Sequence, residues 1–156
     1  MLNKMSRNQT ALFIAAALFG VIVGAWIFEY AGYAPCELCL KQRWAYYLGI
    51  PFALLLGLTK PSWIKPGLYV LATLLAANAI FGVYHSGVEW KFWAGPSTCT
   101  GGVVATDGLP NLGTPGVMCD QPAIRILGLS LAGWNALICA TLAAIAFRAA
   151  QKTQGQ

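Results

Sequence analysis

Residues 35–58 read PCELCLKQRWAYYLGIPFALLLGL, and this stretch indicates both the fold and the chemistry. It places a Cys-x-x-Cys pair, Cys36 and Cys39, directly before an apolar segment, with the cation Arg43 four residues after the second sulfur. Residues 44–58 contain no charge at all. Because redox dithiols and metal sites both use the Cys-x-x-Cys spacing, the rest of the chain has to distinguish between them.

The composition is that of a membrane protein. Of the 156 residues, 58% are hydrophobic and only 10% are charged, against about 25% charged in an average soluble domain. A net charge of +5 could suit nucleic acid, but the cations stand at the ends of apolar blocks, where such residues set membrane topology. We therefore expect one integral membrane domain over residues 1–156, in contact with lipid and without a nucleic-acid partner.

Four apolar blocks predict an all-α membrane protein, a four-transmembrane-helix bundle with two external cysteine-bearing loops. The first block has 18 uncharged residues, more than the apolar core of about 7–15 residues in a signal peptide, so we expect an uncleaved helix. Pro66 suits the first position of the third helix. The expected helices are approximately 11–30, 40–58, 66–84 and 126–147, and the external loops are 31–39 and 85–125.

Four crossings would put both termini on one side of the membrane. That side would carry six cations and no acid, whereas the other would carry four cations and all five acids. The positive-inside rule therefore favours cytoplasmic termini. Four of the five cysteines would then lie outside, in a compartment where disulfides form and persist.

The loop cysteines allow two disulfides, Cys36–Cys39 and Cys99–Cys119. A structural staple fits the second, but the ring of the first is too small to add much loop-closure entropy, and strained, exposed disulfides tend to be catalytic. Cys39 also lies at an expected helix start, where backbone N–H groups and nearby cations favour a thiolate. We therefore favour a redox role for the first pair. Zinc bound by the four cysteines, or with His85, fits less well, because structural zinc sites usually use two tight ligand pairs.

Several other side chains have more than one interpretation. Arg43 is either an interfacial cation that reaches the lipid head groups or a donor for a ligand such as a quinone, held at the helix mouth. His85 is a cap, an interfacial residue or a ligand contact. Asn78 and Asn135 are expected to form hydrogen bonds between helices, and Cys139 is expected to be a small buried apolar residue.

The chain resembles the disulfide bond formation protein B family. The resemblance rests on Pro35-Cys36-x-x-Cys39 followed by Gln42-Arg43 at the start of the second helix, on four membrane helices and on a spaced cysteine pair in the second loop. It implies a quinone-dependent protein-disulfide oxidoreductase of the bacterial inner membrane, with its cysteine loops in the periplasm. Such an enzyme would reoxidise a thioredoxin-like thiol oxidoreductase and reduce ubiquinone or menaquinone.

The resemblance also implies a role for each site residue. Cys99 would form the mixed disulfide with the partner protein, and Cys119 would resolve it and exchange with Cys36. Cys39 would be the thiolate that meets the quinone, and Arg43 would help to hold the quinone, with His85 as a further candidate contact.

Two other functions remain open from the sequence. One is a non-enzymatic four-helix scaffold with stapled loops, and the other is a reductive relative of the vitamin K epoxide reductase type. The direction of electron flow would separate the enzymes, and the absence of thiol-dependent quinone reduction would indicate the scaffold.

Overall fold

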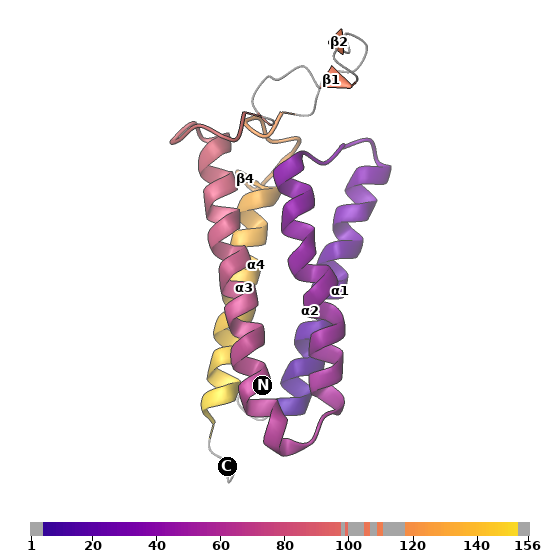
Figure 1. Ribbon diagram of the computed structural model, residues 1–156, viewed down its shortest axis with the longest axis vertical. Coiled ribbons are helices and arrows are strands. Elements are labelled where there is room, and N and C mark those ends of the chain that lie inside the picture. The colour runs from indigo at the N-terminus through magenta and orange to yellow at the C-terminus, as the bar shows by residue number, and fades with distance from the viewer. Residues whose placement is uncertain (1–4, 98, 100–104, 107–108, 111–117, 153–156) are drawn as a thin grey trace.

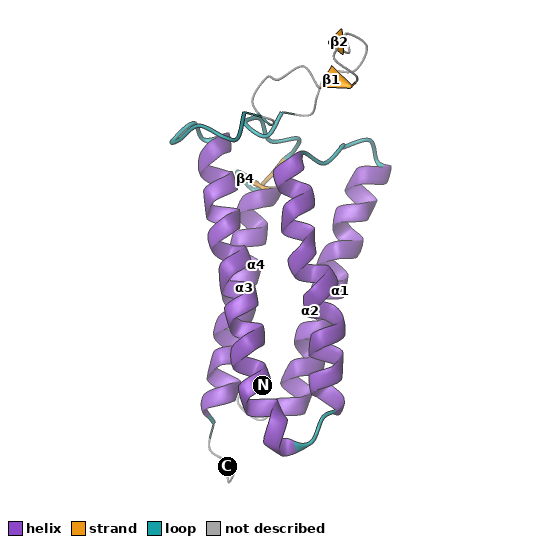
Figure 2. Cartoon of the chain, in the orientation of Figure 1, coloured by secondary structure: helices purple, strands orange, loops and turns teal. Residues whose placement is uncertain are grey.

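The computed structural model describes residues 5–97, 99, 105–106, 109–110 and 118–152. Four helices run antiparallel along the long axis of the molecule (Figure 1). The loops and two short hairpins gather at the ends, as Figure 2 shows. The helices are α1 (Arg7–Tyr30), α2 (Glu37–Leu58), α3 (Pro61–Glu89) and α4 (Leu131–Gln151), and the paired strands are β1 (Ala105–Thr106) with β2 (Leu109–Pro110) and β3 (Arg125–Ile126) with β4 (Leu129–Ser130).

Three helices are long and apolar enough to cross a membrane: α1, α4 and the Ser62–Glu89 part of α3. α2 has 22 residues, a length of about 33 Å at 1.5 Å per residue. Its first two turns carry Glu37, Lys41 and Arg43, and these charges lower its mean hydropathy. α2 nevertheless packs against both α1 and α3 within the same bundle.

An apolar core runs between the helices. α1 and α3 contribute large aliphatic side chains at spacings of three and four residues, which fall on one face of a helix, whereas α4 buries mainly alanines and so approaches its neighbours closely. The core includes Ile14, Leu18 and Ile22 of α1, Leu68, Leu71 and Leu75 of α3, and Ala143, Ala146, Ala149 and Ala150 of α4. Many other large apolar side chains face outward, as expected where lipid is the solvent.

Gly82 permits the close approach of α3 to α4. A Cβ at this position would lie 3.0 Å from the backbone nitrogen of Ala136 and 3.1 Å from its Cα. Because these are backbone atoms of a packed helix, we expect Gly82→Val to lower the free energy of unfolding by about 1–3 kcal/mol. Heat-induced unfolding of the purified protein measures this. The matched control is Gly20→Val, since nothing lies within 4 Å of a Cβ there; equal stability of the two variants would contradict the argument.

α3 is longer than the sequence analysis expected. It begins at Pro61 rather than at residue 66. Most of the connection expected over residues 59–65 is therefore helical, and Pro66 lies inside the helix. It also continues to Glu89, which places His85 within its last two turns rather than at the start of a loop. The reason is that hydropathy marks the limits of the apolar block, whereas a helix continues through polar residues until its backbone pairing ends.

α4 begins later than expected. The segment after residue 125 forms the β3–β4 hairpin, whose turn residues Leu127 and Gly128 have φ values of 52° and 85°. Two positive φ values are what a two-residue hairpin turn of type I′ requires. Ser130 then caps α4 by accepting the N–H of Gly133 at 3.2 Å. The apolar residues of this hairpin made it resemble the start of the fourth helix.

Candidate redox site

Cys36 and Cys39 occupy the N-terminus of α2. Cys36 is the N-cap residue, and its Sγ accepts the backbone N–H of Cys39 at 3.2 Å. The two sulfur atoms are free thiols that lie 2.9 Å apart, farther than the bond of about 2.05 Å in a disulfide. The free N–H groups of a helix N-terminus favour negative charge, so the backbone supports a thiolate at this position.

The two thiols differ in acidity because they share a proton. The hydrogen bond between the sulfurs raises the pKa of Cys36, as does burial, and the same hydrogen bond lowers the pKa of Cys39. Both cysteines precede the uncharged run 44–58, which is the apolar part of α2. Of the two sulfurs, Cys39 therefore loses its proton more readily, and Cys39 is the residue that lines the neighbouring cavity.

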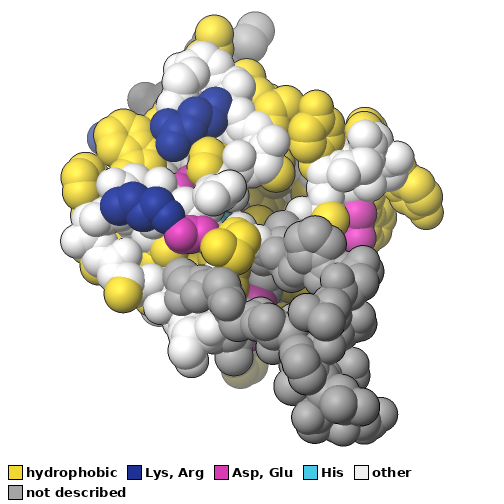
Figure 3. Space-filling view, turned by 90° about the horizontal axis from the view of Figure 1, so that it is seen from above, with side chains coloured by type: hydrophobic (Ala, Val, Ile, Leu, Met, Phe, Trp, Pro, Cys, Tyr) yellow, Lys and Arg dark blue, Asp and Glu magenta, His cyan; other side chains and the backbone are white. Residues whose placement is uncertain are grey.

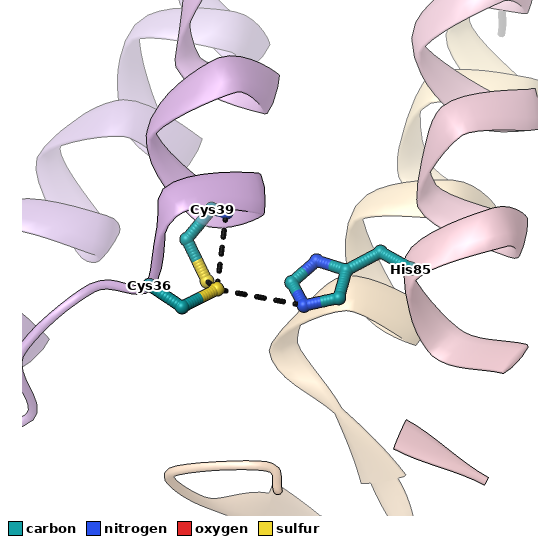
Figure 4. Close-up of side chains that lie close together, drawn as sticks. All are labelled: Cys36, Cys39 and His85. Atoms are coloured by element: carbon teal, nitrogen blue, oxygen red, sulfur yellow. Dashed lines mark hydrogen bonds between the residues drawn. The ribbon is translucent and has the colours of Figure 1, made fainter. Parts of the chain in front are cut away.

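His85 connects α3 to the sulfur pair, as Figure 4 shows. Its Nε2 lies 3.5 Å from Cys36 Sγ, and its Nδ1 lies 3.0 Å from Nε2 of Gln42. The ring is 1% exposed, and it also interacts with the backbone of Cys119. Because the Gln42 amide donates to Nδ1, the remaining ring proton sits on Nε2 and points toward the Cys36 sulfur.

Glu89 follows His85 by one helical turn and is almost as deeply buried. Its side chain is 5% exposed, and Oε1 lies 3.8 Å from Nε2 of His85. Among the described residues, Oε2 has no hydrogen-bond partner. A carboxylate in this position was not singled out from the sequence, because an acid at the end of an apolar block gives no sign of burial.

Cys99 and Cys119 form a disulfide. Both residues are buried, and they share one cluster with Cys36 and Leu38. The N–H of Cys119 donates to the carbonyl oxygen of Cys99 at 2.9 Å. The structure therefore joins one of the two pairs that the sequence allowed, leaves the other reduced, and brings all four loop cysteines into one small volume.

A cavity of about 350 Å³ opens beside Cys39, a volume within the range of about 300–1,000 Å³ for small-molecule sites. Its walls are mainly apolar side chains from α1, α2 and α4, with a few polar groups among them. The apolar wall includes Val21, Ile22, Phe28, Leu131 and Ile138, and the polar groups are Cys39, Gln42, Arg43, Tyr46 and Asn135. Seen from the cysteine-bearing end, apolar side chains are visible inside a recess near the middle of the face (Figure 3).

Arg43 lies at the cavity wall and is 9% exposed. Its NH1 donates to Oε2 of Glu29 at 2.6 Å. This burial disfavours the interpretation of Arg43 as a cation that reaches out to lipid head groups. A guanidinium has five N–H donors, and Glu29 is its only hydrogen-bond partner among the described residues. Arg43 therefore keeps donors for a ligand in the cavity.

The inner end of the cavity is polar. Tyr46 donates its hydroxyl hydrogen to Oδ1 of Asn135, which also accepts from Nδ2 of Asn78 at 3.3 Å. The expectation that both asparagines form hydrogen bonds between helices is therefore confirmed. Asn78 Nδ2 and the Tyr46 hydroxyl also contact Cys139 Sγ, at 3.3 and 3.4 Å. Nδ2 of Asn135 is buried and has no partner among the described residues, and Asn135 is one of the residues that line the cavity.

Comparison with known proteins identifies relatives along most of the chain. The family described as "Disulfide bond formation protein DsbB" matches residues 7–149. An uncharacterised protein of Rickettsia prowazekii is 30% identical over 122 residues, which are 73% of this chain and 70% of the relative. Two proteins named "Disulfide bond formation protein B" are each 29% identical to this chain. The match to the protein of Aromatoleum aromaticum covers 85% of this chain and 82% of that protein. The match to the protein of Azoarcus sp. covers 85% of this chain and 87% of that protein. No solved structure matches the chain significantly.

Proposed function

Because the chain belongs to the disulfide bond formation protein B family, we propose that it oxidises a periplasmic thioredoxin-like thiol oxidoreductase and passes the electrons to a membrane quinone. The protein would thereby sustain disulfide bond formation in other proteins. The observation that carries the proposal is the position of Cys39, the more acidic sulfur of a dithiol, at the wall of an apolar cavity that also contains Arg43.

The cavity fits a quinone by its chemistry. A quinone ring is apolar and flat, and it presents two carbonyl oxygens that accept hydrogen bonds. The cavity provides apolar walls, the guanidinium of Arg43 and the side chain of Asn135, whose buried Nδ2 has no partner among the described residues. A buried donor without a partner is costly, and a carbonyl oxygen from a ligand would satisfy it. When bound, a quinone supplies an acceptor for two electrons and two protons.

The cysteines would act in sequence. A thiolate of the partner protein attacks Cys99 and releases Cys119 as a thiolate. The second partner thiol, rather than Cys119 as expected from the resemblance, then displaces Cys99, because attack by Cys119 would return the partner in its reduced state; the partner therefore leaves oxidised. Cys119 attacks Cys36 within the Cys36–Cys39 disulfide, and Cys39 leaves as the thiolate because its pKa is lowered. Resolution by Cys99 regenerates the Cys99–Cys119 disulfide. The reduced Cys36/Cys39 pair then gives up two electrons and closes its disulfide again. The structure, in which Cys99 and Cys119 are bonded and Cys36 and Cys39 are free thiols, corresponds to the state just before this last step.

The membrane arrangement is part of the proposal. α2 would be a fourth crossing, since it packs within the bundle of three apolar helices. The chain starts and ends at one end of the bundle, where Arg7 Nε donates to the carbonyl oxygen of Ala149 at 3.3 Å. Among the described residues, five cations and no acid belong to this end, namely Arg7, Lys60, Lys65, Arg148 and Lys152, so it would face the cytoplasm of a bacterial inner membrane. The cysteines would face the periplasm.

A reconstituted assay tests the function directly. The purified protein, a reduced thioredoxin-like oxidoreductase and ubiquinone or menaquinone are mixed, and quinol and partner disulfide are measured together. Equal amounts of the two products are expected. Net electron flow from quinol to the oxidised partner would instead indicate the reductive, vitamin K epoxide reductase type of activity. No thiol-dependent quinone reduction by the wild type would leave the stapled scaffold as the better description.

Asn135 tests the fit of the quinone to the inner end of the cavity. We expect Asn135→Leu to raise KM for quinone about three- to tenfold, because one neutral hydrogen bond is lost, while KM for the partner protein stays unchanged. The control is Thr141→Val on the same helix, where an exposed hydroxyl donates only to the carbonyl of Leu137. A folded Asn135→Leu protein with wild-type KM for quinone would exclude the contact.

A further inference from the structure

We propose that the reduced protein binds a zinc ion through Cys36, Cys39 and His85, and that closure of the Cys36–Cys39 disulfide expels the ion. The proposed site goes beyond the thiol oxidase function and does not depend on it, because it requires only the dithiol state that the structure contains. Cys99 and Cys119 take no part, since they are bonded to each other. The site is therefore different from the four-cysteine zinc centre considered from the sequence.

The ligand atoms are already close to the positions that zinc requires. One sulfur from each cysteine and one ring nitrogen of His85 all lie within 4.8 Å of one another. Tetrahedral zinc, with Zn–S of about 2.3 Å and Zn–N of about 2.0–2.1 Å, sets neighbouring ligand atoms about 3.5–3.8 Å apart. Cys36 Sγ and His85 Nε2 are separated by 3.5 Å. The two sulfurs, now 2.9 Å apart, would have to separate by about 0.9 Å, and Cys39 Sγ already lies within 4.8 Å of the His85 ring nitrogen.

Glu89 provides an independent sign that a cation belongs here. Its side chain is only 5% exposed, and its Oε1 lies 3.8 Å from Nε2 of His85. Its other oxygen, Oε2, has no hydrogen-bond partner among the described residues. A carboxylate out of water is costly unless a positive charge lies nearby. Ser130 hydrogen-bonds to this carboxylate and the positive charge of Arg125 acts on it, which compensates it in part, whereas Arg43 is paired with Glu29. A divalent cation between the sulfurs and His85 would compensate this carboxylate.

The surroundings also supply what a metal site needs beyond its ligands. Gln42 contacts Nδ1 of His85 at 3.0 Å. When Nε2 binds the metal, Nδ1 carries the proton, and rotation of the Gln42 amide lets its oxygen accept that proton, which fixes the ring. Cys39 lines the open cavity, so an ion has an entry path. Binding would displace the proton that the two thiols share and leave both sulfurs as thiolates.

Zinc and oxidation would exclude each other. Two sulfurs that are bonded to one another cannot act as thiolate ligands, so the ion would bind only to the reduced form. By linkage, an ion that binds one state stabilises that state. Zinc would therefore hold the cysteine pair reduced and slow its reoxidation, whatever the electron acceptor is.

The binding test uses the full chain with Cys99→Ala and Cys119→Ala, reduced without oxygen and freed of quinone, so that its result does not depend on the proposed catalysis. Zn²⁺ is titrated against a chromophoric chelator, and Co²⁺ serves as the spectroscopic probe. We expect about one ion per chain, tetrahedral cobalt absorption with thiolate-to-cobalt charge transfer, and loss of both signals on oxidation.

Three further substitutions, each made in that background, test the assignment. Cys39→Ser, His85→Gln and Glu89→Gln are each expected to weaken zinc binding at least about tenfold. Cys139→Ala, which removes the other free cysteine, is the matched control and should leave the affinity unchanged. Heat-induced unfolding without metal verifies that each variant folds. Wild-type affinity in any of the three variants, or equal binding by the oxidised protein, would overturn the proposal.

Discussion

Cys39→Ala is expected to lower quinone reduction driven by the reduced partner protein by at least about a thousandfold, because the sulfur that would pass electrons to the cavity is lost. Cys39 alone combines a lowered pKa with a place in the cavity wall. Quinol formation in the reconstituted assay measures the effect, and quinone binding should be largely retained because Arg43 and the apolar walls remain.

Cys139→Ala is the control for the loss of a thiol as such. Cys139 is also free but lies in the apolar core, and its replacement should change quinone reduction by less than about twofold. Wild-type turnover in the Cys39→Ala protein would refute the proposed electron path.

Arg43→Leu is expected to raise KM for quinone about ten- to a hundredfold, since a charged donor to a carbonyl oxygen contributes about 1.5–3 kcal/mol. Arg43→Lys should show a smaller defect, because lysine keeps the charge but lacks the planar fork. The release of Glu29 should have little effect on stability, since its side chain is 43% exposed and exposed ion pairs contribute little. Initial rates at varied quinone concentration give both KM values.

Lys41→Leu is the matched control for Arg43→Leu. Lys41 stands on the same helix and pairs with Glu37 at 2.6 Å, but its side chain is 52% exposed and does not line the cavity. It should keep the wild-type KM. If the two leucine variants behaved alike, the effect of Arg43 would be one of general charge near the helix start and not of contact with the ligand.

The local part of the site follows from sequence spacing. Cys36, Cys39 and Arg43 stand within eight consecutive residues at the start of an apolar block, and one helix start is enough to place a cap, a sulfur in the first turn and a cation in the second. Hydrogen bonds between helices for Asn78 and Asn135 were also predictable, because an amide inside an apolar block needs a polar partner on another helix.

The rest of the site depends on how the helices pack. Glu29 of α1 meets Arg43, His85 of α3 meets Cys36, and Asn135 of α4 joins the cavity wall only after the bundle forms. Because these residues are far apart along the chain, the sequence alone does not indicate that their side chains lie close together in the fold. The limits of two helices were predicted wrongly for a related reason. An apolar block shows which residues contact lipid, but it does not show where helical hydrogen bonding begins or ends. α3 therefore extends past its apolar block, and β3 and β4 occupy the expected start of α4.

The hydrogen-bonded position of Cys139 has a practical consequence for experiments on the intact protein. Its side chain is 0% exposed, and its sulfur is enclosed by Tyr46, Asn78 and Asn135. A maleimide reagent applied under native conditions should therefore modify Cys39, the partly exposed member of the pair, when it is reduced, and spare Cys139 in every state. Each chain would then report the oxidation state of its Cys-x-x-Cys pair as a mass increment, without any cysteine having been removed beforehand.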